Sequence, residues 1–212
     1  MTSEAKKTNT ELATAARLSA YAAAALAGTH ATGEVVYSGP QNLAIGLGFS
    51  QNLDLDEGGT SPDVLLSNYS FLGGTYSGAS VQTYPGQLVG FTSTNTGRNY
   101  VSLLSSGDLI DATTVGPSFF GSMAYGANNP EAEFNSVTGG FLGLSFPISG
   151  ATHFGWVRVD VDNAASAFTI VDWAYESVAG EGINAGEVPE PGSLALLAAG
   201  AAGLIARRRK TA

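Results

Sequence analysis

Acidic residues gather in one Gly-rich segment, LDLDEGGTSPD, at residues 53–63. Asp54, Asp56 and Asp63 bring three carboxylates to this segment, and carboxylate oxygens in a loop are ligands that Ca²⁺ prefers. The segment departs from the EF-hand loop, because glycines occupy the fifth and sixth positions from Asp54 and the distal Glu is missing. The spacing leaves two interpretations, a weak calcium site or a solvated acidic turn.

Four further carboxylates lie on a predicted hairpin: Asp160, Asp162, Asp172 and Glu176. Two carboxyl groups about 5 to 9 Å apart would suit the hydrolysis of a glycosidic bond. Nothing in the sequence sets that distance, so solvated carboxylates at strand ends are the favoured interpretation. His153, the only histidine in residues 32–187, has no G-x-S-x-G nucleophile elbow to accompany it and is expected to be a structural strand residue.

Aromatic residues on the same hairpin are candidates for carbohydrate binding. Trp156, Trp173 and Tyr175 would form a sugar-stacking platform if they were exposed together, because aromatic faces suit the apolar faces of sugar rings. Packing in a hydrophobic core is the alternative.

The hairpin that must position these groups is predicted by apolar and polar alternation around a DNAAS turn. On the first strand Val157, Val159 and Val161 share one face, and Trp156, Arg158 and Asp160 share the other. On the returning strand Val171, Trp173 and Tyr175 share one face, and Ile170, Asp172 and Ala174 share the other. The valine face is expected in the core, which places Arg158 and Asp160 on the outer face or at a sheet edge.

Short alternating runs bounded by Gly, Pro, Asn or Asp continue through residues 32–187 and predict an all-β fold, a single β-sandwich or jelly-roll-like domain. The chain has 212 residues and no Cys, which excludes disulfides and thiolate chemistry. Residues 32–187 carry 15 Asp and Glu against two Arg, a net charge of 2 − 15 = −13. This charge opposes binding to nucleic acid and to anionic lipid.

The first 31 residues resemble an export signal. Lys6, Lys7 and Arg17 precede or flank an Ala-rich apolar stretch at residues 18–27, and small-residue cleavage candidates end at Ala27 and Ala31. The alternative is an amphipathic Ala-rich helix packed on the domain.

The other end of the sequence combines three features in a fixed order. A Pro189-Glu190-Pro191 triplet is followed by 13 apolar residues at 194–206 and then by the cations Arg207, Arg208, Arg209 and Lys210. As a helix the apolar run would be about 20 Å long, short for a membrane span, but it has no polar face and the cations would stop its transfer. A short transmembrane helix is therefore predicted.

This order of triplet, apolar run and basic cluster resembles a PEP-CTERM sorting signal, found on exported proteins of Gram-negative bacteria, many of which make extracellular polysaccharide. The resemblance implies recognition of the triplet by an exosortase, a transpeptidase-like membrane enzyme that removes the tail. Residues 139–186 also resemble a segment common in exported bacterial β-domains, which supports the β-fold and adds no site.

Together these patterns predict a signal peptide at 1–31, a β-sandwich domain at 32–187 and a sorting signal at 188–212. The expected protein is non-catalytic, passes from the export machinery through the inner membrane to the cell surface or outside, and serves the envelope, matrix or biofilm, with extracellular polysaccharide as a candidate partner. No cofactor is expected apart from the candidate Ca²⁺. A carbohydrate-binding module and a secreted glycan hydrolase with paired carboxylates are the alternatives.

Overall fold

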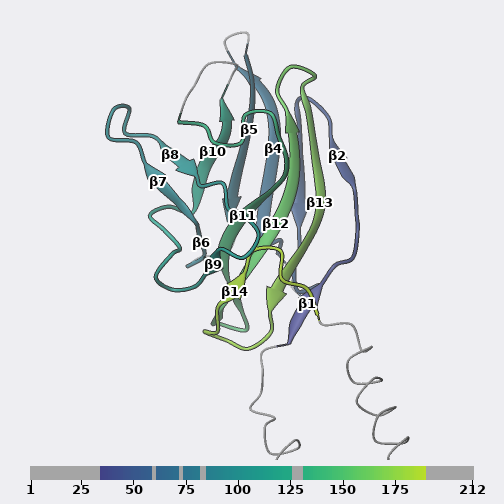
Figure 1. Cartoon of the computed structure of the whole chain (residues 1–212), viewed down its shortest axis with the longest axis vertical. Coiled ribbons are helices and arrows are strands. Elements are labelled where there is room, and N and C mark those ends of the chain that lie inside the picture. Colours follow the sequence, from purple (N-terminus) through teal and green to yellow (C-terminus); the bar gives the residue numbers. More distant parts are fainter. Residues whose placement is uncertain (1–33, 59–60, 72–73, 82–84, 126–130, 190–212) are drawn as a thin grey trace, which may run out of the picture. The chain divides into compact units, whose positions relative to one another are not determined.

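The computed structural model describes residues 34–58, 61–71, 74–81, 85–125 and 131–189. The chain divides into two units, residues 1–33 and 34–212, and every described residue belongs to the second. The described residues form strands and turns without a helix (Figure 1), which confirms the all-β class. The helices expected at the two ends lie outside the described residues. None of the described segments is a helix long and apolar enough to cross a membrane.

Two six-stranded sheets make up most of the body, the name used here for the described part of residues 34–189. The first sheet has the order β1 (Val35–Tyr37), β13 (Ala167–Glu176), β12 (Ala151–Asp162), β11 (Val137–Ile148) and β6 (Gln87–Leu88), and β2 (Leu43–Ile45) also pairs with β13. The second has the order β3 (Phe49–Leu53), β4 (Val64–Phe71), β5 (Gly74–Val81), β10 (Phe120–Tyr125), β8 (Asn99–Val101) and β7 (Gly90–Thr92). A small third sheet pairs β14 (Ile183–Asn184) with β9 (Leu109–Ile110).

The main core joins the two large sheets. The first sheet contributes buried side chains from three long neighbouring strands, among them Leu142, Leu144, Val157, Val159, Val161 and Phe168. The second contributes Leu53, Val64, Leu66, Val101 and Met123. Burial of this much apolar surface is the main stabilising term for a fold of this kind.

The hairpin of β12 and β13 confirms the predicted strands and turn, and all three valines enter the main core as expected. One face assignment was wrong. Arg158 pairs with Asp172 but the next residue, Val159, pairs with Ile170, so the register passes over Val171 as a β-bulge. A bulge adds one residue and reverses the alternation. Ile170 therefore joins Trp173 and Tyr175 in the main core instead of lying beside Asp172.

The outer face of the first sheet carries a second cluster of buried side chains. Phe141, Phe154 and Trp156 project from the sheet, and Ile110 and Ile183 cover them from β9 and β14. This part of the outer face is therefore closed to solvent by β9 and β14.

Candidate functional site

The last residues of the body fold back on to the second cluster. Ile183 and Ala185 are buried there, and Ile183 pairs with Ile110. The amide of Ala185 donates to the carbonyl of Asp108 at 2.8 Å, and the carbonyl of Ala185 accepts from the amide of Gly107 at 2.9 Å. These contacts hold the chain on the body well beyond the last long strand.

Gly186 turns the chain across the face of Phe141. Its φ is +79°, and a Cβ at this position would lie 3.0 Å from Phe141 Cζ and 3.2 Å from Ser106 Oγ. Only glycine adopts this conformation in so little space. The turn brings the following residue, Glu187, over Trp156.

Trp156 binds the chain at that point. Its indole Nε1 donates to the carbonyl oxygen of Glu187 at 3.1 Å, and the residue is only 1% exposed. The Phe141 ring meets the indole edge to face, with centroids 5.3 Å apart and an interplanar angle of 85°. The carboxylate of Glu187 accepts from both the amide and the side-chain nitrogen of Asn184, each at 2.9 Å. Glu187 is thus held through its backbone and its side chain.

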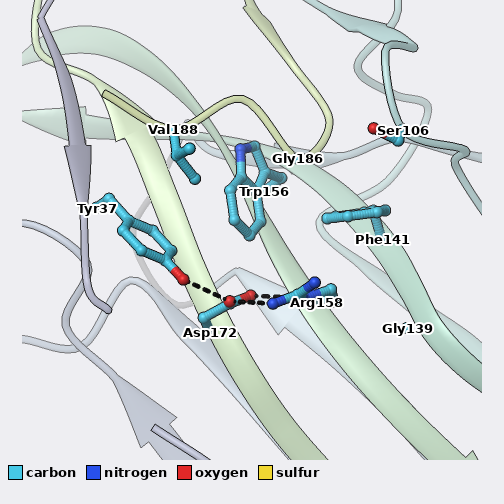
Figure 2. A pocket seen from close by; sticks show the side chains of 9 residues that line it. All are labelled: Tyr37, Ser106, Gly139, Phe141, Trp156, Arg158, Asp172, Gly186 and Val188. Atoms are coloured by element: carbon cyan, nitrogen blue, oxygen red, sulfur yellow. Dashed lines mark hydrogen bonds and ion pairs between the residues drawn. The ribbon is translucent and has the colours of Figure 1, made fainter. Parts of the chain in front are cut away.

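A pocket of about 290 Å³ lies beside Trp156, and Val188 forms part of its wall (Figure 2). At its base Asp172, 1% exposed, accepts hydrogen bonds from Tyr37 Oη at 2.7 Å and from Arg158 Nε at 2.9 Å, and a second Arg158 nitrogen completes the ion pair. The hydrogen bond to Asp172 raises the pKa of Tyr37, and the same partner raises the pKa of Arg158. The three groups tie β1, β12 and β13 together on the outer face.

Residues 187–210 match the family described as the PEP-CTERM protein-sorting motif. The chain carries a PEP-CTERM sorting signal. The signal implies export, sorting to the surface of a Gram-negative bacterium and processing by an exosortase. Neither the curated proteins nor the solved structures gave a match to the chain.

Most of the predicted export and sorting residues lie outside the described residues. These are Ala27 and Ala31 at one end, and Glu190, Pro191, the apolar run and the basic cluster Arg207, Arg208, Arg209 and Lys210 at the other. Pro189 is described and exposed, one residue after the pocket wall at Val188. The PEP-CTERM motif therefore begins on the folded body, at Glu187.

The predicted calcium ligands are brought together by the structure. Each of Asp54, Asp56 and Asp63 offers one carboxylate oxygen, and these oxygens lie within 4.8 Å of one another. Asp63 is 4% exposed and accepts from the amide of Leu55 at 2.8 Å. Burial and, to a smaller extent, the charges of Asp56 and Asp54 raise the pKa of Asp63, the Leu55 amide opposes them, and the resulting pKa is about 6. The arrangement suits a cation, and calcium binding stays a prediction.

The hairpin carboxylates each have a structural partner. Asp160 accepts from the amide of Gly139 at 2.7 Å, and Asp162 accepts from the amide of Ala165 at 3.0 Å in the turn. Asp172 is held in the ion pair, and Glu176 accepts from the amide of Val178 at 2.7 Å. His153 is buried in β12, where its Nδ1 donates to the carbonyl of Glu176 at 2.9 Å.

The three aromatic candidates are buried and do not form a common platform. Trp173 and Tyr175 lie in the main core, whereas Trp156 lies in the second cluster on the opposite face. Their separation follows from the register, because Trp156 stands opposite Ala174 and Val157 stands opposite Trp173. Sequence reasoning missed the role of Trp156 as a donor to Glu187. The signal that pointed to it was a lone tryptophan on the outer face together with Gly186 just ahead of the motif.

Proposed function

We propose that this protein is a non-catalytic component of the envelope or extracellular matrix, whose β-sandwich is the delivered part. An exosortase removes the tail at Pro189-Glu190-Pro191 after a brief stay in the inner membrane, and the body is then released or transferred to the cell surface. The alternative of permanent anchoring is less favourable, because 13 apolar residues barely cross a bilayer.

One observation carries this proposal: the sorting motif starts at the residue where the folded body ends. Glu187 is bonded to Trp156 and Asn184, and the motif match begins at Glu187. The folded part of residues 34–189 therefore remains intact when the tail is removed. Its acidic surface, with 15 Asp and Glu against two Arg in residues 32–187, favours release from anionic lipid.

The test uses the full chain in a Gram-negative host that makes an exosortase, beside the same host with the exosortase gene deleted. Mass spectrometry of the surface and medium fractions should show a product without Arg207–Lys210 only where the exosortase is present. Replacing Pro189 and Pro191 by Ala should block processing while leaving the melting temperature of the body unchanged. A surface product that keeps Arg207–Lys210 would show that the tail is an anchor.

Contact with polysaccharide is a second candidate function, and an aromatic pair on the second sheet favours it. Tyr69 of β4 and Tyr76 of β5 are cross-strand partners with ring centroids 5.6 Å apart and nearly parallel planes, at 22°. Tyr69 is 40% exposed, so one sugar ring has an aromatic surface to meet. Binding of the released protein to host polysaccharide should fall in Tyr69→Ala, with the exposed Phe49→Ala as the control.

A further inference from the structure

The body leaves no free chain between itself and the sorting triplet. Residues 183–187 are bonded to the rest of the body at Ile110, Asp108, Gly107 and Trp156. Val188 contributes to the wall of the pocket, although its side chain stays half exposed. The next residue is Pro189, the first of the Pro-Glu-Pro triplet.

The contact between Trp156 and Glu187 is the outermost of these bonds. The indole is almost fully buried, with Phe141 and Tyr37 close to it (Figure 2). Its Nε1 reaches the carbonyl of Glu187 only while Glu187 stays in place. Lifting Glu187 off the body would break this hydrogen bond and uncover part of the indole, and both changes are unfavourable. The docked state of residues 187–188 is therefore stabilised by the tryptophan side chain.

A peptidase that cuts at the triplet has to take up residues on both sides of the cut. The residues on the body side are the docked ones, Glu187 and Val188. Cleavage of a folded protein proceeds through local opening, and its rate follows the population of the open form when opening and closing are fast. The more tightly residues 187–188 are held on the body, the more slowly the exosortase is then expected to cut.

We infer that Trp156 is a positioning residue for exosortase processing: it latches residues 187–188 to the body, and the tail is removed at a rate set by how often this latch opens. The inference rests on the proposed function, since it concerns the same cut. The body then controls the rate of its own release, and the inference gives a role to the bond between the buried indole and Glu187 and to the turn at Gly186.

The first arm of the test compares two matched substitutions in the full chain. Trp156→Phe removes the N–H donor and keeps an aromatic ring, and it should accelerate conversion of precursor to tail-free product about three- to tenfold, the factor that corresponds to one hydrogen bond. Trp173→Phe makes the same chemical change in the main core, away from Glu187, and should leave the rate within about a factor of two. A pulse-chase followed by mass spectrometry gives both rates.

The second arm separates the latch from a general loosening of the body. Four residues, Gly-Ser-Gly-Ser, inserted between Val188 and Pro189 give the exosortase free chain without any change to the body. This insertion should accelerate processing at least as much as Trp156→Phe does. In the chain with the insertion, Trp156→Phe should add no further acceleration.

Each result decides between the two proposals. Equal or slower processing of Trp156→Phe, or an acceleration that persists in the chain with the insertion, would overturn the latch and leave exosortase processing intact. A parent chain that the exosortase never shortens would overturn the proposed function and the latch with it. The amide of Glu187 donates to the carbonyl of Asn184 at 2.9 Å, and faster exchange of this amide hydrogen in Trp156→Phe, measured on the purified full chain, is the expected physical sign of opening.

Discussion

Two aspartates of the body are buried to nearly the same extent but have neighbours of opposite charge. Asp172, 1% exposed, receives a guanidinium and a phenol hydroxyl. Asp63, 4% exposed, accepts hydrogen bonds from the backbone of Leu55 and Asp56 and has the carboxylates of Asp54 and Asp56 beside it. Burial disfavours a charge unless a counter-charge offsets it. Asp172 therefore links neighbouring strands through its ion pair, whereas Asp63 would be stabilised by a proton or a bound cation.

The largest effect should come from removing the counter-charge of Asp172. Arg158→Met leaves a buried carboxylate without its cation, and such a loss destabilises a protein by about 3 kcal/mol or more. We place it at the low end, about 3 kcal/mol, because Arg158 itself is 37% exposed. Urea unfolding of the full chain measures it.

Arg98→Met is the matched control, since Arg98 is the other arginine of residues 32–187 and is exposed. An interaction made by an exposed arginine contributes about 1 kcal/mol or less, so Arg98→Met should lower the free energy of unfolding clearly less than Arg158→Met does. A loss in Arg158→Met no larger than that in Arg98→Met would show that Asp172 does not need its cation.

The second effect is the contribution of Asp63 to the pH dependence of the stability of the body. Its folded pKa of about 6 exceeds the unfolded value of 3.8. Below the unfolded pKa the carboxyl is protonated in both states. As the pH rises to about 6, the unfolded chain loses the proton first, so the body loses about 2–3 kcal/mol of stability. Asp63→Asn keeps an acceptor for the Leu55 amide and removes the charge.

The measurement is the free energy of unfolding of both proteins at pH 4 and pH 7. The free energy of unfolding of Asp63→Asn should rise relative to that of the parent between pH 4 and pH 7. The other titrating groups are the same in both proteins, so their effects cancel in this comparison. A constant difference would mean that Asp63 ionises in the body as easily as it does in the unfolded chain.

A third, smaller effect belongs to the Asp172 side of the comparison. Tyr37→Phe removes the hydroxyl that donates to Asp172 and leaves the ion pair with Arg158. We expect a loss of about 1.5 kcal/mol, the lower value for a hydrogen bond to a charged group. Thermal unfolding checks it, with Tyr69→Phe as a control on the other sheet. Equal melting temperatures of Tyr37→Phe and the parent would show that the ion pair alone suffices for Asp172.

The fold was predictable where one strand carries its own signal. Alternation over ten or more residues was enough for β12 and β13, and the turn residues between them were recognisable. The bulge at Val171 was not, because it exists only in the pairing of the two strands. The cover formed by β9 and β14 was missed for another reason, since two-residue strands carry no period.

The candidate sites were likewise predictable where their residues lie in one segment, and not where distant segments form them. Asp54, Asp56 and Asp63 lie in one short segment, so their convergence could be predicted from spacing. The bond between Trp156 and Glu187 joins residues 31 positions apart, and that between Tyr37 and Asp172 joins residues 135 apart. Such contacts depend on how whole strands pack. Trp156 and Gly186 could be singled out in the sequence, but the bond between Trp156 and Glu187 could not be predicted from it. The sorting motif was predictable because its three parts follow one another in sequence.

The smallest expected effect is that of Ca²⁺ on the Asp63 side, and it would complete the comparison by supplying the missing counter-charge. A cation that binds only the folded body stabilises it by about 1 kcal/mol at about five times its dissociation constant. For a body of this size the gain raises the melting temperature by about 2–4 °C. Melting in millimolar Ca²⁺ and in chelator, at pH 7, should show this rise.

The same melts at pH 5 separate binding at Asp63 from a general ionic effect. Below its pKa of about 6 the Asp63 carboxyl is mostly protonated in the body and is a poor ligand, so the calcium shift should shrink. Asp63→Asn should show no shift at either pH, because one of the three converging carboxylates is gone. Equal melting temperatures with Ca²⁺ and with chelator at pH 7 would leave the segment as a solvated acidic turn. In that case only a proton offsets the burial of the Asp63 charge, and the two aspartates differ because Asp172 has the cation Arg158 beside it whereas Asp63 has backbone donors and two carboxylates.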